Sequence, residues 1–330
     1  MRNFVAIIAI ASIIGIATAR HGFSARAAVP GGEVNSTIDR LSDIAAEPLQ
    51  RILPPAPPPP VQPPKNTSGT SFTGVLSAEG VIALDHVTGE VLFEKNSHVA
   101  RPLASITKLM SLLIISERIQ DWSATTTISA DDVEEGNQTI GGGEVYSMED
   151  LYAAAIIGSY NTAVNALVDG TGMTREEFVL EMNRRARDFG TEGMSFVEPT
   201  GLSPDNIGTP ADVALLMKIA LSHPRVKVTS MQEKAVITEV DSKKKKVVHA
   251  TDWLLTNTVA MKGAHIEGGK TGYIPEAGYN FSGQIKSDAG NEIRVVVLGA
   301  TDVYSRFTET AKIAEWIFEN FEWVSAEEKY

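Results

Sequence analysis

The sequence of 330 residues contains no cysteine, which excludes disulfide bonds and zinc sites built on thiolates. It also excludes a bacterial lipoprotein anchor, because the lipid of that anchor is carried by a cysteine. Histidine is scarce: the six histidines show neither a His-Glu-x-x-His pattern nor close pairing, which disfavours a metallopeptidase. We therefore expect no metal site and no cofactor.

Basic residues are in the minority. Lysine and arginine together number 29 against 41 aspartates and glutamates, so the net charge is -12 at pH 7. An acidic protein is repelled by a phosphate backbone, and we therefore expect no nucleic-acid partner.

The N-terminal region is apolar. Residues 4–19 have almost no polar side chain, follow the basic Arg2 and end in Ala-Thr-Ala before Arg20. This order is typical of a secretory signal peptide, and sixteen apolar residues are short for a membrane span. Residues 1–19 are therefore predicted to be a signal peptide, or alternatively an uncleaved anchor that tethers the protein to the membrane. Both readings predict an exported protein that acts in the periplasm or the cell wall space.

The next segment, residues 20–70, is small and polar and contains a proline-rich run over residues 54–64. Proline runs favour the extended polyproline II conformation, so this run is typical of a stiff spacer. A binding motif for a partner domain is the competing interpretation. We expect a disordered linker over residues 20–70 and a catalytic domain over residues 71–325.

The pattern of the remaining chain predicts an α+β fold. Two apolar runs around a glycine-containing turn at residues 80–94 predict a β-hairpin. Residues 105–119 are apolar nearly all round, which predicts a helix buried in the middle of the protein. One antiparallel sheet with packed helices is expected from these and the other predicted elements, namely helices over 147–168, 210–221 and 304–321 and strands over 236–240, 246–250, 279–285 and 293–300.

Three short motifs stand out. Residues 105–108 read Ser-Ile-Thr-Lys, residues 159–161 read Ser-Tyr-Asn and residues 270–272 read Lys-Thr-Gly. A second Ser-x-x-Lys begins at Ser242, so this pattern arises easily by chance, whereas the other two each occur once. The sequence around each motif is therefore needed to decide whether its residues are catalytic or structural.

The first motif predicts an activated nucleophile. Ser105 and Lys108 are three residues apart on a predicted helix, so their side chains share a face. Burial in this apolar helix disfavours the ammonium form of Lys108 and lowers its pKa, which makes the amine a usable base for the Ser105 hydroxyl. The alternative is a capping serine followed by a lysine whose amine reaches solvent.

The other two motifs are predicted at the edge of a cleft. Ser159 and Asn161 follow a helix expected to end near Gly158, so we place them in a loop, although the same residues also suit an ordinary turn. Lys270 and the two residues after it lie between glycines, just ahead of the strand predicted over 279–285. A cation and a hydroxyl there suit an anionic group, and a strand edge suits an extended peptide.

These motifs resemble those of the serine-type D-alanyl-D-alanine carboxypeptidases among the low-molecular-weight penicillin-binding proteins. The resemblance covers about residues 75–320 and extends to the stretches 83–92, 104–110, 196–202 and 269–280. It implies a β-lactamase/DD-peptidase-like fold, in which an antiparallel sheet with packed helices is joined to a helical subdomain.

The resemblance also implies catalytic roles. Ser105 is the residue that is acylated, and Lys108 is its base. Ser159 together with Lys270 passes the proton to the leaving D-alanine. Asn161 holds the substrate amide.

Substrate binding is likewise implied by the resemblance. The backbone N–H groups of Ser105 and Tyr273 form the oxyanion hole. Thr271 and Gly272 belong to the same substrate-binding strand edge. Arg306 matches in position an arginine that the family uses on the terminal carboxylate of the substrate.

Two residues depart from the family pattern. Thr162 stands where the family usually has an acidic residue, and Glu198 replaces an asparagine before the proline of the 196–202 stretch. A carboxylate at that place loosely resembles the glutamate that activates water in some β-lactamases.

The chain after the last predicted helix is short, so the C-terminal β-domain of some relatives is expected to be absent, as in the soluble endopeptidases of the family.

The sequence therefore predicts a serine DD-peptidase that acts on peptidoglycan stem peptides, either removing the terminal D-alanine or cutting cross-links. β-Lactams are expected as covalent inhibitors. A β-lactamase on the same scaffold and a penicillin-binding sensor without turnover are the two alternatives.

Overall fold

The computed structural model describes residues 61–134 and 140–323. The predicted signal or anchor and most of the predicted linker fall outside these residues. The last part of the linker differs from the prediction, because β1 (Lys65–Asn66) pairs antiparallel with β13 (Phe321–Glu322). The ordered body therefore begins before residue 71.

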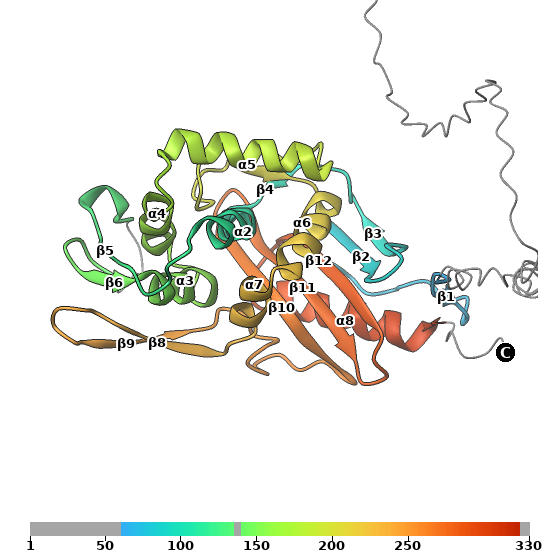
Figure 1. The fold of residues 1–330 in the computed structure, drawn as a ribbon. Helices are drawn as coiled ribbons and strands as arrows, with labels where there is room; N and C mark the ends of the chain where they lie inside the picture. Colours follow the sequence, from blue (N-terminus) through green and yellow to red (C-terminus); the bar gives the residue numbers. More distant parts are fainter. Residues whose placement is uncertain (1–60, 135–139, 324–330) are drawn as a thin grey trace, which may run out of the picture. The chain divides into compact units, whose positions relative to one another are not determined.

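The central element is a five-stranded antiparallel sheet with the strand order β10-β11-β12-β2-β3 (Figure 1). The predicted hairpin over 80–94 is confirmed and forms the β2–β3 side of the sheet. The strands near the end of the chain complete it. The bounds are β2 Gly80–Asp85, β3 Val91–Lys95, β10 Ala264–Ile274, β11 Gly278–Ser287 and β12 Glu292–Ala300.

All but one of the helices of the described residues lie between β3 and β10, and the remaining one follows β12. Two of them are single 3-10 turns. The bounds are η2 Ala104–Thr107, α2 Lys108–Arg118, η3 Ala130–Asp132, α3 Met148–Ile157, α4 Asn161–Gly170, α5 Arg175–Phe189, α6 Pro210–Ser222, α7 Pro224–Ser230 and α8 Ser305–Asn320.

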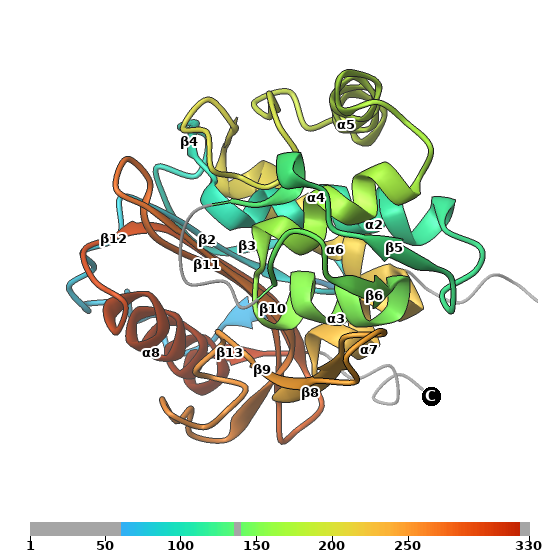
Figure 2. The same ribbon diagram turned by 90° about the vertical axis from the view of Figure 1, so that its left-hand side faces the viewer.

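Both faces of the sheet are covered, which is why its central strands are apolar on both sides. In β12, Val295 and Val297 pack into a cluster with residues of α8, whereas Val296 and Leu298 pack into the cluster of the other helices. This alternation follows from the two-residue period of a strand. Figure 2 shows the sheet between α8 and the remaining helices. The predicted α+β class is confirmed.

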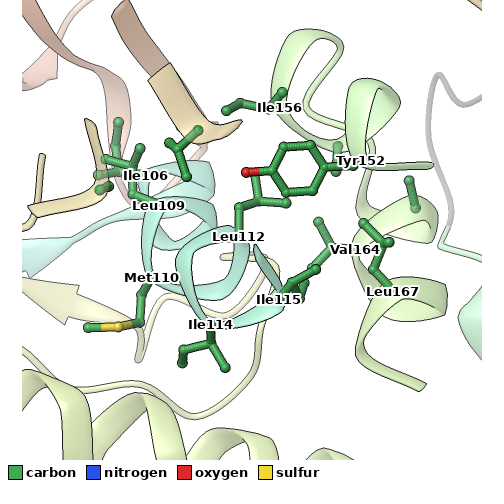
Figure 3. Close-up of a cluster of buried hydrophobic side chains, with 14 of the residues drawn as sticks. Ile106, Leu109, Met110, Leu112, Ile114, Ile115, Tyr152, Ile156, Val164 and Leu167 are labelled. Atoms are coloured by element: carbon green, nitrogen blue, oxygen red, sulfur yellow. The ribbon is translucent and has the colours of Figure 1, made fainter. Parts of the chain in front are cut away.

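The helix α2 is the buried element that the sequence predicts. Figure 3 shows Met110, Leu112 and Ile115 leaving the helix in different directions, with Tyr152 and Val164 of neighbouring helices close by. Each of these five side chains is completely buried. A helix that is apolar all round must be enclosed in this way, because any exposed face would place apolar surface in water.

The helical region differs from the prediction in two places. The helix predicted over 147–168 is two helices, because the chain turns at Ser159, whose φ of +61° is incompatible with a right-handed helix. The helix α5 was not predicted, and only four of its residues are buried. Its start nevertheless has a local signal, since Thr174 and Glu177 form a capping box.

Short two-stranded sheets join the helices. The β8–β9 pair confirms the two strands predicted over 236–240 and 246–250, with small shifts in their bounds. Among the helices of residues 61–134 and 140–323, none combines the length and the apolar character needed to cross a membrane. The remaining bounds are β4 Arg101–Pro102, β5 Thr125–Thr127, β6 Val145–Ser147, β7 Ile207–Gly208, β8 Lys234–Thr238 and β9 Lys245–His249.

Candidate active site

Ser105 lies in the 3-10 turn η2, at the point where the chain passes from β4 into the buried helix α2. The preceding residue, Ala104, has a φ of +49°, an uncommon conformation for a residue with a Cβ atom. The side chain of Asn280 in β11 stabilises this turn by donating to the carbonyl oxygens of Pro102 (3.1 Å) and Leu103 (3.0 Å). The position of Ser105 is therefore set by the sheet as well as by its own helix.

Lys108 is the first residue of α2 and is completely buried. Its Nζ lies 2.8 Å from Ser105 Oγ, 2.6 Å from Asn161 Oδ1 and 2.6 Å from the carbonyl oxygen of Thr200. The sequence predicted the first of these contacts from the spacing. The other two come from α4 and from the loop that follows Pro199.

This arrangement suits an uncharged amine. Burial lowers the pKa of Lys108 from 10.5 to about 7, against the opposing effect of Glu198 and Glu134. A neutral amine has two N–H donors and one lone pair, and the oxygens of Asn161 and Thr200 can only accept hydrogen bonds. The lone pair is therefore left for the hydroxyl of Ser105, which is the geometry that a general base requires.

The second motif lies in the sharp turn between α3 and α4. The sequence placed both Ser159 and Asn161 in a loop, but Asn161 is the first residue of α4. The positive φ of Ser159 reverses the chain after Gly158 and directs the two side chains to the two lysines of the site. Asn161 contacts Lys108, and Ser159 contacts Lys270.

Lys270 lies ahead of the strand predicted over 279–285, which is β11, and is itself part of β10, a strand that was not predicted. Its Nζ donates to Ser159 Oγ at 2.7 Å and to the carbonyl oxygen of Thr271 at 3.0 Å. Burial lowers the pKa of Lys270 well below its ordinary value, and the charge of Arg306, together with that of Lys108 when it is protonated, lowers it further. The second and third motifs are thus joined through a lysine and a serine.

The edge strand β10 approaches the backbone of Ser105 very closely. A Cβ atom at Gly272 would lie 2.9 Å from the carbonyl oxygen of Leu103 and 3.1 Å from the backbone nitrogen of Ser105. Only a glycine allows this approach without displacing the turn. The next residue, Tyr273, is 49% exposed, and its ring stacks on that of Tyr279.

Thr271 and Arg306, two other residues predicted to bind substrate, make hydrogen bonds within the protein. Thr271 Oγ1 lies 2.6 Å from Thr251 Oγ1. Arg306 in α8 is largely buried, and its Nη1 donates to the carbonyl oxygen of Gly272 at 3.2 Å. The guanidinium group also lies over the ring of Phe307. Its observed contact is with the strand β10.

Glu198 organises the loop that covers Lys108. Its Oε2 accepts hydrogen bonds from the backbone and the hydroxyl of Thr200, both at 2.6 Å. Its Oε1 accepts from the backbone of Gly201 at 2.5 Å and from Asn206 Nδ2 at 2.8 Å. Both carboxylate oxygens of Glu198 therefore accept hydrogen bonds from this loop, and the side chain stabilises its conformation.

Thr162, which stands where the family usually has an acidic residue, makes a hydrogen bond through its hydroxyl group. Thr162 is completely buried, and its Oγ1 accepts a hydrogen bond from the backbone of Glu134 at 3.2 Å. Asn165, one turn later on α4, donates to Glu134 Oε1 at 3.1 Å. Hydrogen bonding at the start of α4 is thus maintained without a carboxylate at position 162.

Two asparagines with an important part in the site were not predicted from the sequence. Asn280 supports the turn before Ser105 and accepts from the backbone of Gly299 at 2.8 Å. The side-chain Nδ2 of Asn206 donates to Thr107 Oγ1 at 3.2 Å. Its backbone carbonyl oxygen accepts from the backbone nitrogen of Leu103 at 2.8 Å. An asparagine is unusual inside an apolar strand, and this was the one available signal for Asn280.

Gly201 offers a test of how closely the loop fits the nucleophile. Its φ is +89°, and a Cβ atom there would overlap the carbonyl oxygen of Ala104 and lie 2.9 Å from the backbone nitrogen of Ser105. We expect Gly201→Ala to slow acylation of Ser105 by about 100-fold, because a displacement of about 1 Å at a reacting atom has this effect. The measurement is the rate of covalent labelling by penicillin, followed by intact mass.

Gly290→Ala is the matched control. Gly290 has a nearly identical φ of +90°, but a Cβ atom there would meet no atom within 4 Å. We expect Gly290→Ala to lose about 1 kcal/mol of unfolding free energy through the unfavourable φ alone. Gly201→Ala should lose more, because its Cβ atom also overlaps the backbone of Ala104, and only this variant should lose the acylation rate. Equal acylation rates in the two variants would contradict a close fit between the loop and Ser105.

Comparison with known proteins agrees with this geometry. The sequence profile described as D-alanyl-D-alanine carboxypeptidase matches residues 66–302. The D-alanyl-D-alanine carboxypeptidase DacF of Bacillus subtilis is 28% identical over 255 residues, which are 74% of this chain and 63% of that protein. A D-alanyl-D-alanine endopeptidase of Pseudomonas aeruginosa is 26% identical over 77% of this chain and 81% of its own length.

A solved structure is similar as well. Penicillin-binding protein D2 of Listeria monocytogenes, in its ampicillin-bound form, matches with a TM-score of 0.65 and 29% identity, over 75% of this chain and all of that chain. The profile match covers more than half of the sequence and includes all three motifs. The chain therefore belongs to the D-alanyl-D-alanine carboxypeptidase family.

Proposed function

We propose that this protein is a serine DD-peptidase that forms an acyl-enzyme on Ser105 and acts on peptidoglycan stem peptides. The observation that carries the proposal is the environment of the Lys108 amine. Two carbonyl oxygens accept its N–H groups, and its lone pair is left for the hydroxyl of Ser105. A base and a nucleophile held in this way are what acyl transfer at neutral pH requires.

The proposed reaction begins when Ser105 Oγ attacks the carbonyl carbon between the two D-alanines and its proton passes to Lys108 Nζ. The backbone N–H groups of Ser105 and Tyr273 stabilise the resulting oxyanion. The bond to the leaving D-alanine then breaks, and its nitrogen takes a proton from Ser159, which takes one in turn from the ammonium group of Lys270. The proton held by Lys108 restores the charge of Lys270. Water finally hydrolyses the ester: Lys108 takes a proton from the water and returns it to Ser105 Oγ as the acyl bond breaks.

The other predicted residues have binding roles in this proposal. Asn161 is placed to hold the substrate amide while its oxygen orients Lys108. Thr271 and Gly272 offer the edge of β10 to the substrate, which binds as an extended peptide. Arg306 attracts the terminal carboxylate and also stabilises the carbonyl of Gly272.

β-Lactams are proposed to acylate Ser105 and to remain attached. The structure of the Listeria relative contains ampicillin, which supports binding of this class of compound. Rapid hydrolysis has less support, because both carboxyl oxygens of Glu198 already accept hydrogen bonds from their own loop. A glutamate used in this way is poorly placed to activate water.

The similar proteins include both carboxypeptidases and endopeptidases, and the proposal covers both reactions. The apolar composition of residues 4–19 supports export, since peptidoglycan lies outside the cytoplasmic membrane. These residues lie outside the described part of the structure.

The direct test incubates the full-length protein with purified stem peptides that end in D-Ala-D-Ala and, separately, with cross-linked muropeptides. We expect loss of one D-alanine from the first substrate or of the cross-link in the second, followed by mass spectrometry. Covalent labelling by penicillin without any peptide turnover would favour a sensor. Repeated hydrolysis of penicillin would favour a β-lactamase.

A further inference from the structure

A buried carboxylate lies directly behind Lys270 and has no place in the reaction described so far. Asp252, in the segment between β9 and β10, is 5% exposed. Its Oδ1 accepts hydrogen bonds from the backbone of Leu254 at 2.9 Å and of Leu255 at 3.2 Å. Its Oδ2 is buried and has no hydrogen-bond partner among the described residues.

The free oxygen points to the lysine strand. A Cβ atom at Gly269, the residue before Lys270, would lie only 2.6 Å from Asp252 Oδ2, so a glycine is required for the carboxylate to approach β10. A cavity of about 10 Å³ is lined by Asp252, Lys270 and Ser230, together with other residues. This volume is at the lower limit for one water molecule, and the polar groups of Asp252, Lys270 and Ser230 can bind it.

Asp252 opposes the charges that act on Lys270. Arg306 in α8, and Lys108 in α2 whenever it holds a proton, lower the pKa of Lys270, whereas the Asp252 carboxylate raises it. Arg306 and Lys270 in turn favour the charged form of Asp252, although burial raises its pKa to about 6. The carboxylate therefore opposes the loss of the proton from Lys270 above this pH.

We propose that Asp252 is a positioning residue that keeps Lys270 in its ammonium form and aimed at Ser159, acting across the small cavity through one bound water. This inference rests on the proposed function. A charged Lys270 can only donate to Ser159 Oγ, so the hydroxyl hydrogen of Ser159 stays available for the nitrogen of the leaving group. A neutral Lys270 could instead accept that hydrogen and remove it from the leaving group.

The test is Asp252→Asn, which removes the charge while its side-chain oxygen can still accept from the backbone of Leu254 and Leu255. The first readout is the titration of the Lys270 amine by NMR with ¹⁵N-labelled lysine, its signal assigned by its loss in Lys270→Arg. We expect the pKa of Lys270 to fall by about one unit or more, since an opposite charge a few ångströms away shifts a pKa by this amount. This readout does not depend on peptidase activity.

The second readout is the pH profile of acylation by penicillin. In the variant we expect the alkaline decrease of the rate to move to lower pH by the same amount. Below about pH 6 the difference between the variant and the unaltered protein should disappear, because Asp252 itself is protonated there. A residue with a purely structural role would change the rate or the thermal stability equally at every pH.

Glu239→Gln is the matched control. Glu239 is also 5% exposed and uses its carboxylate to accept backbone hydrogen bonds, from Val145 at 3.1 Å and Asp241 at 3.2 Å, but it lies at the β8–β9 hairpin. We expect no change in the titration of Lys270 in this variant. An unchanged titration in Asp252→Asn would overturn the inference, even if acylation of Ser105 is confirmed. If instead Ser105 is never acylated but the titration shifts, only the proposed function fails.

Discussion

Replacement of Ser105 by alanine is expected to abolish covalent labelling by penicillin and to reduce peptide turnover by about 10⁴-fold or more, because no other group can form the ester intermediate. The Ser105 hydroxyl lies 2.8 Å from the amine of Lys108. Removing it should leave the fold intact, since alanine retains the Cβ atom of the turn. The measurements are intact mass after incubation with penicillin and the release of D-alanine from stem peptides.

The second Ser-x-x-Lys motif provides the control for this variant. Ser242 has the same spacing to a lysine but lies at the turn of the β8–β9 hairpin, where its backbone nitrogen donates to Glu239 Oε2 at 2.5 Å. Ser242→Ala is expected to be labelled and to turn over substrate like the unaltered protein. Labelling that persists in Ser105→Ala would disprove the assignment of the nucleophile.

Replacement of Lys108 by methionine is expected to slow acylation by about 10²- to 10⁴-fold, the usual contribution of a general base. Methionine is unbranched and apolar, so it can occupy the buried path of the lysine side chain. The oxygens of Asn161 and Thr200 lose their donor in this variant, and some loss of stability is therefore expected as well. The acylation rate at saturating penicillin separates slow chemistry from weak binding.

The pH dependence of acylation follows from the same lysine. Burial lowers the pKa of Lys108 to about 7, and only the neutral amine can accept the proton of Ser105. The acylation rate of the unaltered protein should therefore fall about tenfold per pH unit below pH 7 and level off above it, until the rate decreases again where Lys270 loses its proton. A rate that keeps rising to pH 10 would mean that the lysine behaves as an exposed one.

Two further variants control for the lysine replacement. Lys108→Arg should not restore the rate, because a guanidinium group stays charged throughout this pH range. Lys245→Met removes the lysine of the second motif and should leave the acylation rate unchanged. Recovery of activity in Lys108→Arg would show that position 108 acts through its positive charge.

The parts of the fold that were predicted correctly are those with strong local patterns. The helix after Ser105 is apolar nearly all round, and the structure buries its residues 108–116. The helix α6 begins at Pro210, as predicted; Thr209 caps it and Pro210 suits its first turn. The hairpins of β2–β3 and β8–β9 follow from apolar runs on either side of turn residues.

The parts that were predicted incorrectly depend on contacts that are distant in the sequence. The break at Ser159 interrupts a segment whose composition is helical on both sides, and it is stabilised partly through Lys270, 111 residues later. The glycine-rich stretch around Gly272 has little strand propensity, yet it forms β10 because β11 pairs with it along its length. Local propensity cannot predict either outcome.

The sequence by itself determined the chemistry: a serine three residues before a lysine in an apolar helix, together with two further motifs that occur once each. Only the tertiary structure decided the geometry and charge of the site. It left the lone pair of Lys108 to Ser105, assigned Glu198 to its loop and placed Asp252 behind Lys270. The physical reason is that burial and neighbouring charges set a pKa, and both arise from residues that the fold brings together from distant parts of the chain.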